Sequence, residues 1–518
     1  MRRVVPAMST LSRRETFLAL SALSLTLLAC DQAERLAGGD PLVKPRAVGA
    51  RALRRAARGD RLRAFYEARH WKAAWTPQLA GELQTAFKEL PRHAIDPAKL
   101  SNMITSESPV LREIELTTAA MAYGDALAHG LARPETLFEI FALERNDAGV
   151  DQGLGLALSG GGLSAWLEGL APVDEEYKTL SAAYLTYRER ADRPMPTPIP
   201  EGKLLKPGER DRRIPQLAQL LDALGYSAVP DVADAALYGP VIVEAVKAFQ
   251  NDNGINADGV LGADTVAALN AGPDDRARQL ALNLEARRWL KREIPPTRID
   301  VNIACAFQTY YRDGRIADSR RVVAGKPGAE TPNLSGAFKQ IVVNPPWNVP
   351  QGIAEKEILP KGRGYLAAND MSIVDGRVIQ RPGPKAALGR VKFDMQNRYA
   401  IYLHDTPSKQ RFNDNERHFS HGCVRVADAV GFARLLAAEH GKTAEFDEKL
   451  AAGETAVVDL EAETPVRLLY HTVFVDPQGR VGFRPDVYGW DATLATALGM
   501  DPPMRRGLAG PAPTSIGP

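Results

Sequence analysis

Residues 399–407 read Tyr-Ala-Ile-Tyr-Leu-His-Asp-Thr-Pro, and residues 417–426 read Arg-His-Phe-Ser-His-Gly-Cys-Val-Arg-Val. Three of the eight histidines fall between positions 404 and 421, and Cys423 follows them. A cysteine with a histidine nearby is the minimum for a thiolate nucleophile, because an imidazole can take the thiol proton. Gly422 permits the backbone to bend close to a substrate carbonyl, where main-chain N–H groups could receive an oxyanion.

Two other interpretations of this stretch compete with a nucleophile. Cys423 with His404, His418 and His421 could hold a structural zinc ion, although zinc sites with cysteine usually pair two cysteines at short spacing, which is missing here. The other alternative is a buried free cysteine among histidines that face solvent.

The region around this motif is predicted to be a β-rich domain. Residues 298–307 largely alternate apolar and polar side chains, and residues 309–311 and 319–324 look extended as well. Asp313-Gly314 between them is typical of a hairpin turn. Cys305 would lie half-buried in the first strand, and we interpret it as a packing residue, because free cysteines are among the most buried residue types.

The chain before this domain is predicted to be helical. Residues 31–192 form a helical scaffold region, in which Phe65, Tyr66, Trp71 and Trp75 lie at helix-like spacing and are interpreted as core. Five glycines within residues 153–162 indicate a flexible loop. Alternating prolines at 194, 196, 198 and 200 predict a stiff linker over residues 193–211.

A small module of three short helices is expected over residues 212–272. Its helices are predicted near residues 214–224, 239–251 and 265–269, and Asp264 could cap the last of them. The charged helix that follows, within residues 273–296, connects the module to the β-rich domain.

Composition excludes several classes of protein. A chain of 518 residues is too long for one ordinary domain, and its net charge of +2 does not favour a nucleic-acid partner. Three cysteines, Cys30, Cys305 and Cys423, cannot form a disulfide framework. No sequence pattern for a nucleotide, a phosphate or calcium is visible, and the chemistry expected here needs no cofactor and no metal.

The first thirty residues have the pattern of an export signal. Residues 1–14 carry four arginines and no acid, and residues 16–29 are an uncharged, Leu-rich run of fourteen. Ala29-Cys30 resembles a bacterial lipobox, so Cys30 could carry lipid, whereas an ordinary cleaved signal is the alternative. A weak twin-arginine pattern leaves the export route open. We expect the mature chain to leave the cytoplasm.

The spacing of His404, nineteen residues before Cys423, with the sequence Ser-His-Gly-Cys-Val-Arg at 420–425, strongly resembles the L,D-transpeptidase family of bacterial cell-wall enzymes. The resemblance extends to Thr331-Pro332, to residues 344–350 and to residues 357–360. Residues 214–271 resemble the peptidoglycan-binding module family, with Leu-Gly-Tyr at 224–226 and Asp-Gly-Val-Leu-Gly at 258–262.

This resemblance implies a multidomain α+β protein of the large periplasmic branch, with a helical scaffold, a peptidoglycan-binding module and a mainly-β catalytic domain. It places the catalytic domain at residues 297–442, with a mobile capping insertion near 351–398. Residues 443–500 would complete the catalytic unit, and residues 501–518 are expected to be a disordered tail.

The resemblance also implies roles for single residues. Cys423 would be the nucleophile, His404 the general acid and base, and the backbone of Gly422 an oxyanion donor. Supporting or substrate-binding roles fall to Ser420, His421, Arg425, Tyr402, Trp347 and Asn348. Arg425 could instead form a structural salt bridge, and Trp347 is equally expected as a core residue.

The implied reaction joins two peptidoglycan stem peptides through a thioester on Cys423. Hydrolysis of that thioester would instead give a carboxypeptidase, and a protein lysine as acceptor would attach protein to the wall. An inactive wall-binding lipoprotein is the alternative outside enzymes. The partners expected are stem peptides and glycan in the periplasm of a Gram-negative-type cell, with a lipid anchor at Cys30 as an option and the oligomeric state left open.

Overall fold

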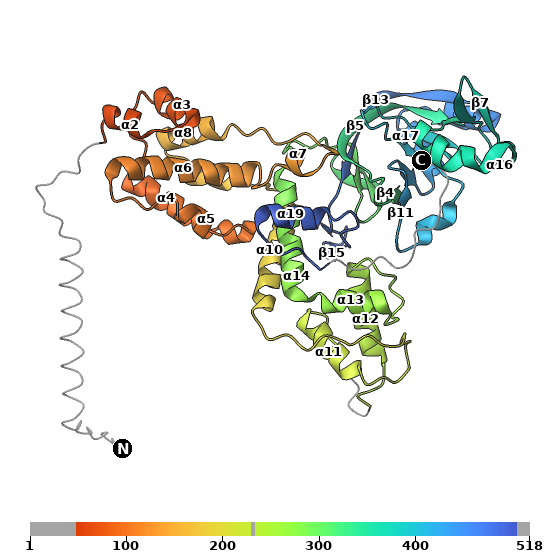
Figure 1. Ribbon diagram of the computed structural model, residues 1–518, viewed down its shortest axis with the longest axis horizontal. Helices are drawn as coiled ribbons and strands as arrows, with labels where there is room; N and C mark the ends of the chain where they lie inside the picture. The colour runs from red at the N-terminus through yellow and green to blue at the C-terminus, as the bar shows by residue number, and fades with distance from the viewer. Residues whose placement is uncertain (1–47, 229–233, 505–518) are drawn as a thin grey trace, which may run out of the picture. The chain divides into compact units, whose positions relative to one another are not determined.

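The computed structural model describes residues 48–228 and 234–504 (Figure 1). Of these, residues 48–74 and 105–117 form one compact unit, and residues 75–104 and 118–504 form the other. The expected export signal, Cys30 and most of the expected tail lie outside the described residues. Within the described ranges, no helix is both long and apolar enough to cross a membrane.

The smaller unit contains α2 (Ala50–Ala56), α3 (Asp60–Ala68) and the first turns of α6 (Pro109–Ala128). Phe65 and Tyr66 are buried, as their spacing predicted, whereas Trp71, and Trp75 at the start of the larger unit, are only half-buried. The Tyr66 hydroxyl lies 2.7 Å from Thr117 Oγ1 and donates to Glu113 Oε1 at 3.1 Å. Burial, together with the Glu113 carboxylate, raises the pKa of Tyr66, so this hydroxyl stays protonated and fixes α3 to α6.

The helical part of the larger unit contains seven short or medium helices: α4 (Pro77–Lys88), η1 (Leu90–His93), α5 (Ala98–Ser101), α7 (Pro134–Leu137), α8 (Val150–Gly160), α9 (Leu163–Glu168) and α10 (Glu175–Ala191). The flexible loop expected over residues 153–162 is therefore wrong, because α8 occupies most of it. A Cβ at Gly153 would lie 2.4 Å from Trp166 Nε1, so this glycine admits the indole of α9 against α8. Tertiary packing outweighs the low helix propensity of glycine here.

The module consists of α11 (Ile214–Ala223), α12 (Pro240–Asp252) and α13 (Ala263–Asn270), which Figure 1 draws in yellow-green and green. Buried Gln250 fixes the turn before α13, since its amide accepts from Gly259 N at 2.8 Å and donates to Val260 O at 2.9 Å. Part of the Pro-rich segment packs on the module: Ile199 is 2% exposed and exchanges two hydrogen bonds with the Asn270 side chain. This part of the expected linker is therefore not a free spacer.

Helix α14 (Gly272–Arg288) is buried along most of its length despite its many charges. Glu285 accepts hydrogen bonds from Leu131 N, Ala132 N and Trp289 Nε1, and it pairs with Arg288 at 2.5 Å. The Arg288 guanidinium also donates to His93 O at 2.8 Å. A buried ion pair of this kind is tolerable because nearly every polar atom in it has a partner.

The C-terminal domain is built on a sheet that closes on itself. Its strand order is β1-β5-β13-β2-β3-β4-β12-β10-β9, and β9 also pairs with β5. The strands are β1 (Phe141–Ala142), β2 (Arg298–Asn302), β3 (Phe307–Arg312), β4 (Arg315–Gly325), β5 (Asn333–Val343), β9 (Val391–Phe393), β10 (Leu403–His404), β12 (Val424–Val426) and β13 (Ala456–Leu469), with β11 (His418–Ser420) on β4.

Two features of this sheet bear on the sequence predictions. The hairpin at Asp313-Gly314 is confirmed, because both residues have positive φ and Arg312 pairs with Arg315. The parallel strand β1 was not expected, since it is a two-residue segment of the scaffold region added to β5. Helices α17 (Ala429–Glu439) and α18 (Thr443–Ala452) add Phe432 and Phe446 to the core of the domain.

Residues 347–388 form a folded subdomain with its own core, whereas β9, within the expected bounds 351–398 of the insertion, belongs to the main sheet. The subdomain contains β6 (Trp347–Asn348), α15 (Gln351–Ile353), η2 (Ala354–Ile358), η3 (Leu359–Lys361), α16 (Gly362–Ala368), β7 (Met371–Val374) and β8 (Arg377–Gln380). Trp347, 1% exposed, packs there with Ile358, Leu366 and Val378. Beyond the sheet, η4 (Lys409–Asn413) precedes the motif, and β14 (Val473–Val475), β15 (Val481–Phe483) and α19 (Trp490–Leu498) end the described chain. The expected multidomain α+β organisation is confirmed.

We predict that Glu285→Gln lowers the free energy of unfolding by about 3–5 kcal/mol, because it leaves the Arg288 guanidinium buried without its counter-charge. Urea unfolding followed by circular dichroism measures this loss. The matched control is Glu144→Gln, whose ion pair with Lys291 is exposed and should leave the stability almost unchanged. Equal effects of the two substitutions would contradict the role assigned to Glu285.

Candidate active site

Cys423 ends a tight turn between β11 and β12. Gly422 has φ +112, and a Cβ there would lie 3.1 Å from Ile401 Cδ1 and 3.4 Å from Glu330 O, so both conformation and space favour glycine. Ser420 Oγ donates to Cys423 O at 2.6 Å and accepts from Gly422 N at 3.2 Å. Ser420 therefore stabilises the turn through both bonds. The Gly422 N–H, which was expected to bind an oxyanion, donates to Ser420 Oγ in this conformation.

His404 lies on β10, which pairs in parallel with β12. Its Nδ1 donates to Asp405 O at 2.5 Å, and this bond fixes Nε2 as the ring nitrogen with the lone pair. The carboxylate of the adjacent residue, Asp405, accepts a hydrogen bond from the backbone N–H of Arg390 and forms an ion pair with Lys409. The ring is fully buried, so its orientation is set by the fold and not by solvent.

The strand register brings the predicted catalytic residues to one face. Leu403 is aligned with Val424 and His404 with Arg425, and alternate residues of a strand point the same way. The Tyr402 ring lies 5.6 Å from the His404 ring and hydrogen-bonds the Cys423 thiol. Tyr402 thus contacts both partners predicted from the motif.

The Cys423 thiol is buried, with the residue 5% exposed. Burial raises its pKa to about 11, while hydrogen bonds from Tyr402 and the charges of Lys392 and Arg425 oppose that rise. Lys392 lies over the Tyr402 ring at 4.2 Å. At neutral pH the thiol is therefore protonated, and a base has to accept its proton when the sulfur reacts.

Arg425 is 1% exposed, and burial lowers its pKa to about 10. It shares the face of Cys423 and acts on the thiol through its charge. Trp347 belongs to the core of the insertion, in agreement with the second of its two interpretations, and Asn348 beside it is exposed. Neither side chain contacts Cys423 or His404 in any bond that the structure records among the described residues.

His421 joins the turn that ends at Cys423 to the insertion. Its Nε2 lies 2.7 Å from Glu357 Oε1 on η2 and 3.1 Å from Lys326 Nζ. The sequence placed His421 in the motif and Glu357 in the matching stretch 357–360, but nothing indicated that the two meet, because they are 64 positions apart. His418, the third histidine, is held elsewhere, by Glu416 and by Ile303 O at 2.8 Å.

Two further residues support the turn and were not predicted as site residues. Thr331 Oγ1 donates to Gly422 O at 2.7 Å and accepts from Gly325 N at 2.9 Å. The Tyr488 hydroxyl donates to Gly325 O at 2.6 Å and accepts from Thr331 N at 3.2 Å. The sequence indicated Thr331 only as part of the Thr-Pro dipeptide of the family resemblance. No sequence pattern linked Tyr488 to the turn.

Residues 296–458 match the family described as the L,D-transpeptidase catalytic domain. The chain carries an L,D-transpeptidase catalytic domain. Residues 60–183 match a scaffold domain, and residues 210–269 match a "Putative peptidoglycan binding domain".

A curated relative from Haemophilus influenzae, named "Putative L,D-transpeptidase", is 34% identical over 224 residues, which are 38% of this chain and 45% of that protein. The match thus spans about half the length of this relative. Crystal structures of L,D-transpeptidases from Stackebrandtia nassauensis (14% identity, 53% of this chain and 97% of that chain, TM-score 0.22) and Xylanimonas cellulosilytica (18%, 52% and 98%, TM-score 0.17) are also similar.

We predict that alkylation of Cys423 by iodoacetamide accelerates about tenfold per pH unit from pH 7 to 9, because only the thiolate reacts and its pKa is raised to about 11. The measurement is peptide mass mapping, which separates Cys423 from Cys305. A rate that is already constant between pH 6 and 8 would instead indicate a preformed thiolate–imidazolium pair.

We predict that Thr331→Val destabilises the catalytic turn by about 1–3 kcal/mol, because it leaves the buried Gly422 carbonyl and Gly325 N–H without their partner. Thermal unfolding and the rate of Cys423 alkylation measure the effect. Thr331→Ser retains the hydroxyl and is the control. If valine and serine behave alike, the hydroxyl does not support the turn.

Proposed function

We propose that this protein is a peptidoglycan L,D-transpeptidase with Cys423 as nucleophile and His404 as general acid and base. The observation that carries the proposal is the arrangement of a buried thiol, Tyr402 and His404 on one face of the paired strands β10 and β12. The match of this domain to the family, and of residues 210–269 to a peptidoglycan-binding module, supports the substrate class.

In the first step, the Cys423 sulfur attacks the carbonyl at the L-centre of a tetrapeptide stem while His404 Nε2 takes the thiol proton. Because the thiol pKa is raised to about 11, this proton moves as the S–C bond forms and not beforehand. The C–N bond to the terminal D-alanine then breaks, and the imidazolium returns the proton to the departing amine. A thioester on Cys423 remains.

In the second step, the side-chain amine of a second stem attacks the thioester carbonyl. His404 accepts a proton from this amine, the amide forms, and the sulfur leaves and is protonated again. The product joins two third-position residues. Water in place of the amine would release a tripeptide, so the acceptor decides between transpeptidase and carboxypeptidase.

The neighbouring groups have supporting roles in this proposal. The Tyr402 hydroxyl beside the thiol can donate to the oxyanion, and Arg425 favours negative charge on the same face. Ser420, Thr331 and the Gly422 backbone position the sulfur. His421 connects this turn to the insertion through Glu357, so the insertion can respond to a bound stem.

The export signal expected at residues 1–30 fits the proposed function, because a peptidoglycan-directed domain works in the cell envelope. We propose a periplasmic location for the mature chain, and lipidation of Cys30 as its means of attachment. Mass spectrometry of the protein isolated from its own cells would detect the lipid as an added mass on Cys30, and an unmodified or earlier N-terminus would contradict it.

We predict that the purified protein converts disaccharide tetrapeptide into dimers joined third residue to third residue, detected by mass spectrometry of the muropeptides. Cys423→Ala should abolish this product, and His404→Gln should lower its rate at least about 100-fold, the smallest usual contribution of a general base. His440→Gln, at the end of α17, is the matched control and should retain the activity.

Each other outcome has a definite meaning. Tripeptide monomer without dimer would identify a carboxypeptidase using the same site. No change with the unaltered protein would contradict catalysis and favour a wall-binding role. Full activity of Cys423→Ala would contradict the assignment of the nucleophile.

A further inference from the structure

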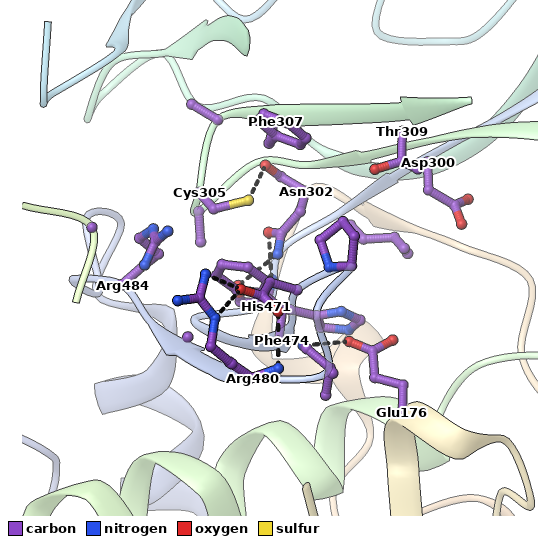
Figure 2. A pocket seen from close by; sticks show the side chains of 18 of the residues that line it. Glu176, Asp300, Asn302, Cys305, Phe307, Thr309, His471, Phe474, Arg480 and Arg484 are labelled. Carbon is purple, nitrogen blue, oxygen red and sulfur yellow. Dashed lines mark hydrogen bonds and ion pairs between the residues drawn. The ribbon is translucent and has the colours of Figure 1, made fainter. Parts of the chain in front are cut away.

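A large cavity lies outside the proposed catalytic residues. It has a volume of about 1560 Å³, and its walls come from β2, β3, the hairpin β14–β15, α10 and residues 251–256 of the module (Figure 2). Cys423 and His404 do not line it, whereas residues 417–419, just before the catalytic turn, do. The volume exceeds the ~300–1,000 Å³ of an ordinary small-molecule pocket, so it suits part of a polymer.

Three arginines of the cavity wall bind backbone carbonyls and not carboxylates. Arg417 donates to Cys305 O and Asp414 O, both at 2.9 Å, and Arg484 donates to Phe483 O at 2.8 Å and Asp252 O at 3.2 Å. Arg321 donates to Phe412 O at 3.2 Å. Among the residues that the structure describes, no carboxylate forms an ion pair with any of the three.

The acidic side chains near these arginines are engaged by other partners. Asp252 accepts from the Tyr226 hydroxyl at 2.8 Å, and Asp476 pairs with Arg480 at 2.7 Å. Glu416 is held by His418. Burial lowers the pKa of Arg417 and of Arg484, and the charges of Glu416 on the first and of Asp252 and Asp476 on the second oppose that shift. These carboxylates offset part of the positive charge without forming ion pairs with the two guanidinium groups.

The three arginines line the same cavity, and Arg417 is within electrostatic range of both Arg321 and Arg484. Arg321 and Arg484 both lower the pKa of Arg417, although burial is the main cause of that shift. Arg417 and Arg484 both oppose the rise that burial gives to the pKa of Cys305. Figure 2 shows the side chain of Arg484 beside Cys305. Cations of like charge gathered in this way destabilise one another unless an anion joins them.

Arg484 is also held in place. Its guanidinium lies over the Phe474 ring at 4.8 Å, and on the module side a Cβ at Gly254 would lie 2.5 Å from its Cδ. Gly254 has φ +67, so glycine is favoured there by conformation as well as by space. A fixed guanidinium loses little side-chain entropy when it binds a ligand, which is the usual property of a preorganised site.

We propose that Arg321, Arg417 and Arg484 form an anion-binding subsite that takes a carboxylate of a peptidoglycan stem peptide. Guanidinium groups match the planar carboxylate with paired N–H donors, and the adjoining module residues 251–256 form another wall of the same cavity. The subsite would hold a segment of the wall away from Cys423. Its ligand rests on the proposed function, whereas its affinity for anions does not.

The test measures co-sedimentation of the full chain with purified sacculi free of teichoic acid. The double variant Arg321→Gln/Arg484→Gln should bind about tenfold more weakly than the unaltered protein, and the difference should shrink in high salt. The matched control is Arg480→Gln, which lines the same cavity but is already paired with Asp476, and it should bind normally. Equal binding by the double variant and the unaltered protein would overturn the proposal.

A second arm identifies the anion. Amidation of the stem carboxylates with carbodiimide and glycinamide should weaken binding of the unaltered protein to the level of the double variant and weaken the double variant no further. If the difference between the two proteins survives amidation, the carboxylate assignment is wrong. Circular dichroism checks folding, and Arg321→Glu, at an exposed position, serves as a second variant that should weaken binding if the double variant unfolds.

The outcome separates this proposal from the proposed function. Conversion of soluble disaccharide tetrapeptide should depend on Cys423 and change less than about twofold in the double variant, since none of the three arginines contacts Cys423 in the bonds recorded for the described residues. Weak sacculus binding with normal conversion supports the subsite. Normal binding and normal conversion in the double variant reject it while the proposed function stands. Arginine-dependent binding without conversion by any form of the protein rejects the enzyme and keeps the subsite.

Discussion

The parallel pairing of β10 with β12 is the interaction on which the candidate site depends. The two strands have two and three residues, too few to be stable alone. They keep their register because β12 also pairs with β4, β10 with β9, and β9 with β5, so the sheet closes around them. A slip by one residue would send His404 and Tyr402 to the opposite face from Cys423. The closure of the sheet is thus a condition for the chemistry.

Burial of the Cys423 thiol opposes its ionisation, and the groups around it only partly reverse that effect. It raises the pKa of Cys423 to about 11, and the nearby cations Lys392 and Arg425 and the Tyr402 hydroxyl recover only part of that cost. A neutral resting thiol is less exposed to oxidation than a thiolate, because oxidants attack the anion. The turn that carries this thiol is joined to the insertion by the His421–Glu357 pair.

The sequence alone predicted those parts of the molecule that are specified by neighbouring residues. The motif at 420–425 and its distance from His404, the turn at Asp313-Gly314 and the three helices of the module are patterns of neighbouring residues. Contacts between distant segments were not predictable: α8 forms despite its three glycines because Trp166 packs on Gly153, and Ile199 joins the module through Asn270. Glu357, Thr331 and Tyr488 reach the site from separate segments for the same reason, and the roles of the predicted site residues stay predictions.

Helix α14 forms hydrogen bonds both to the module and to the segment around Arg484, so these parts are connected by direct contacts as well as by the chain. Arg276 on α14 donates to Asn253 Oδ1 at 2.6 Å and to Ala268 O, while Gln279 of the same helix donates to Arg484 O at 2.7 Å. The two Arg276 bonds are buried and the Gln279 bond is partly buried, so breaking them would leave costly unpaired groups. Polar bonds also fix orientation more narrowly than apolar packing does, because they have directions as well as distances. A cavity with walls from both parts can therefore keep one shape.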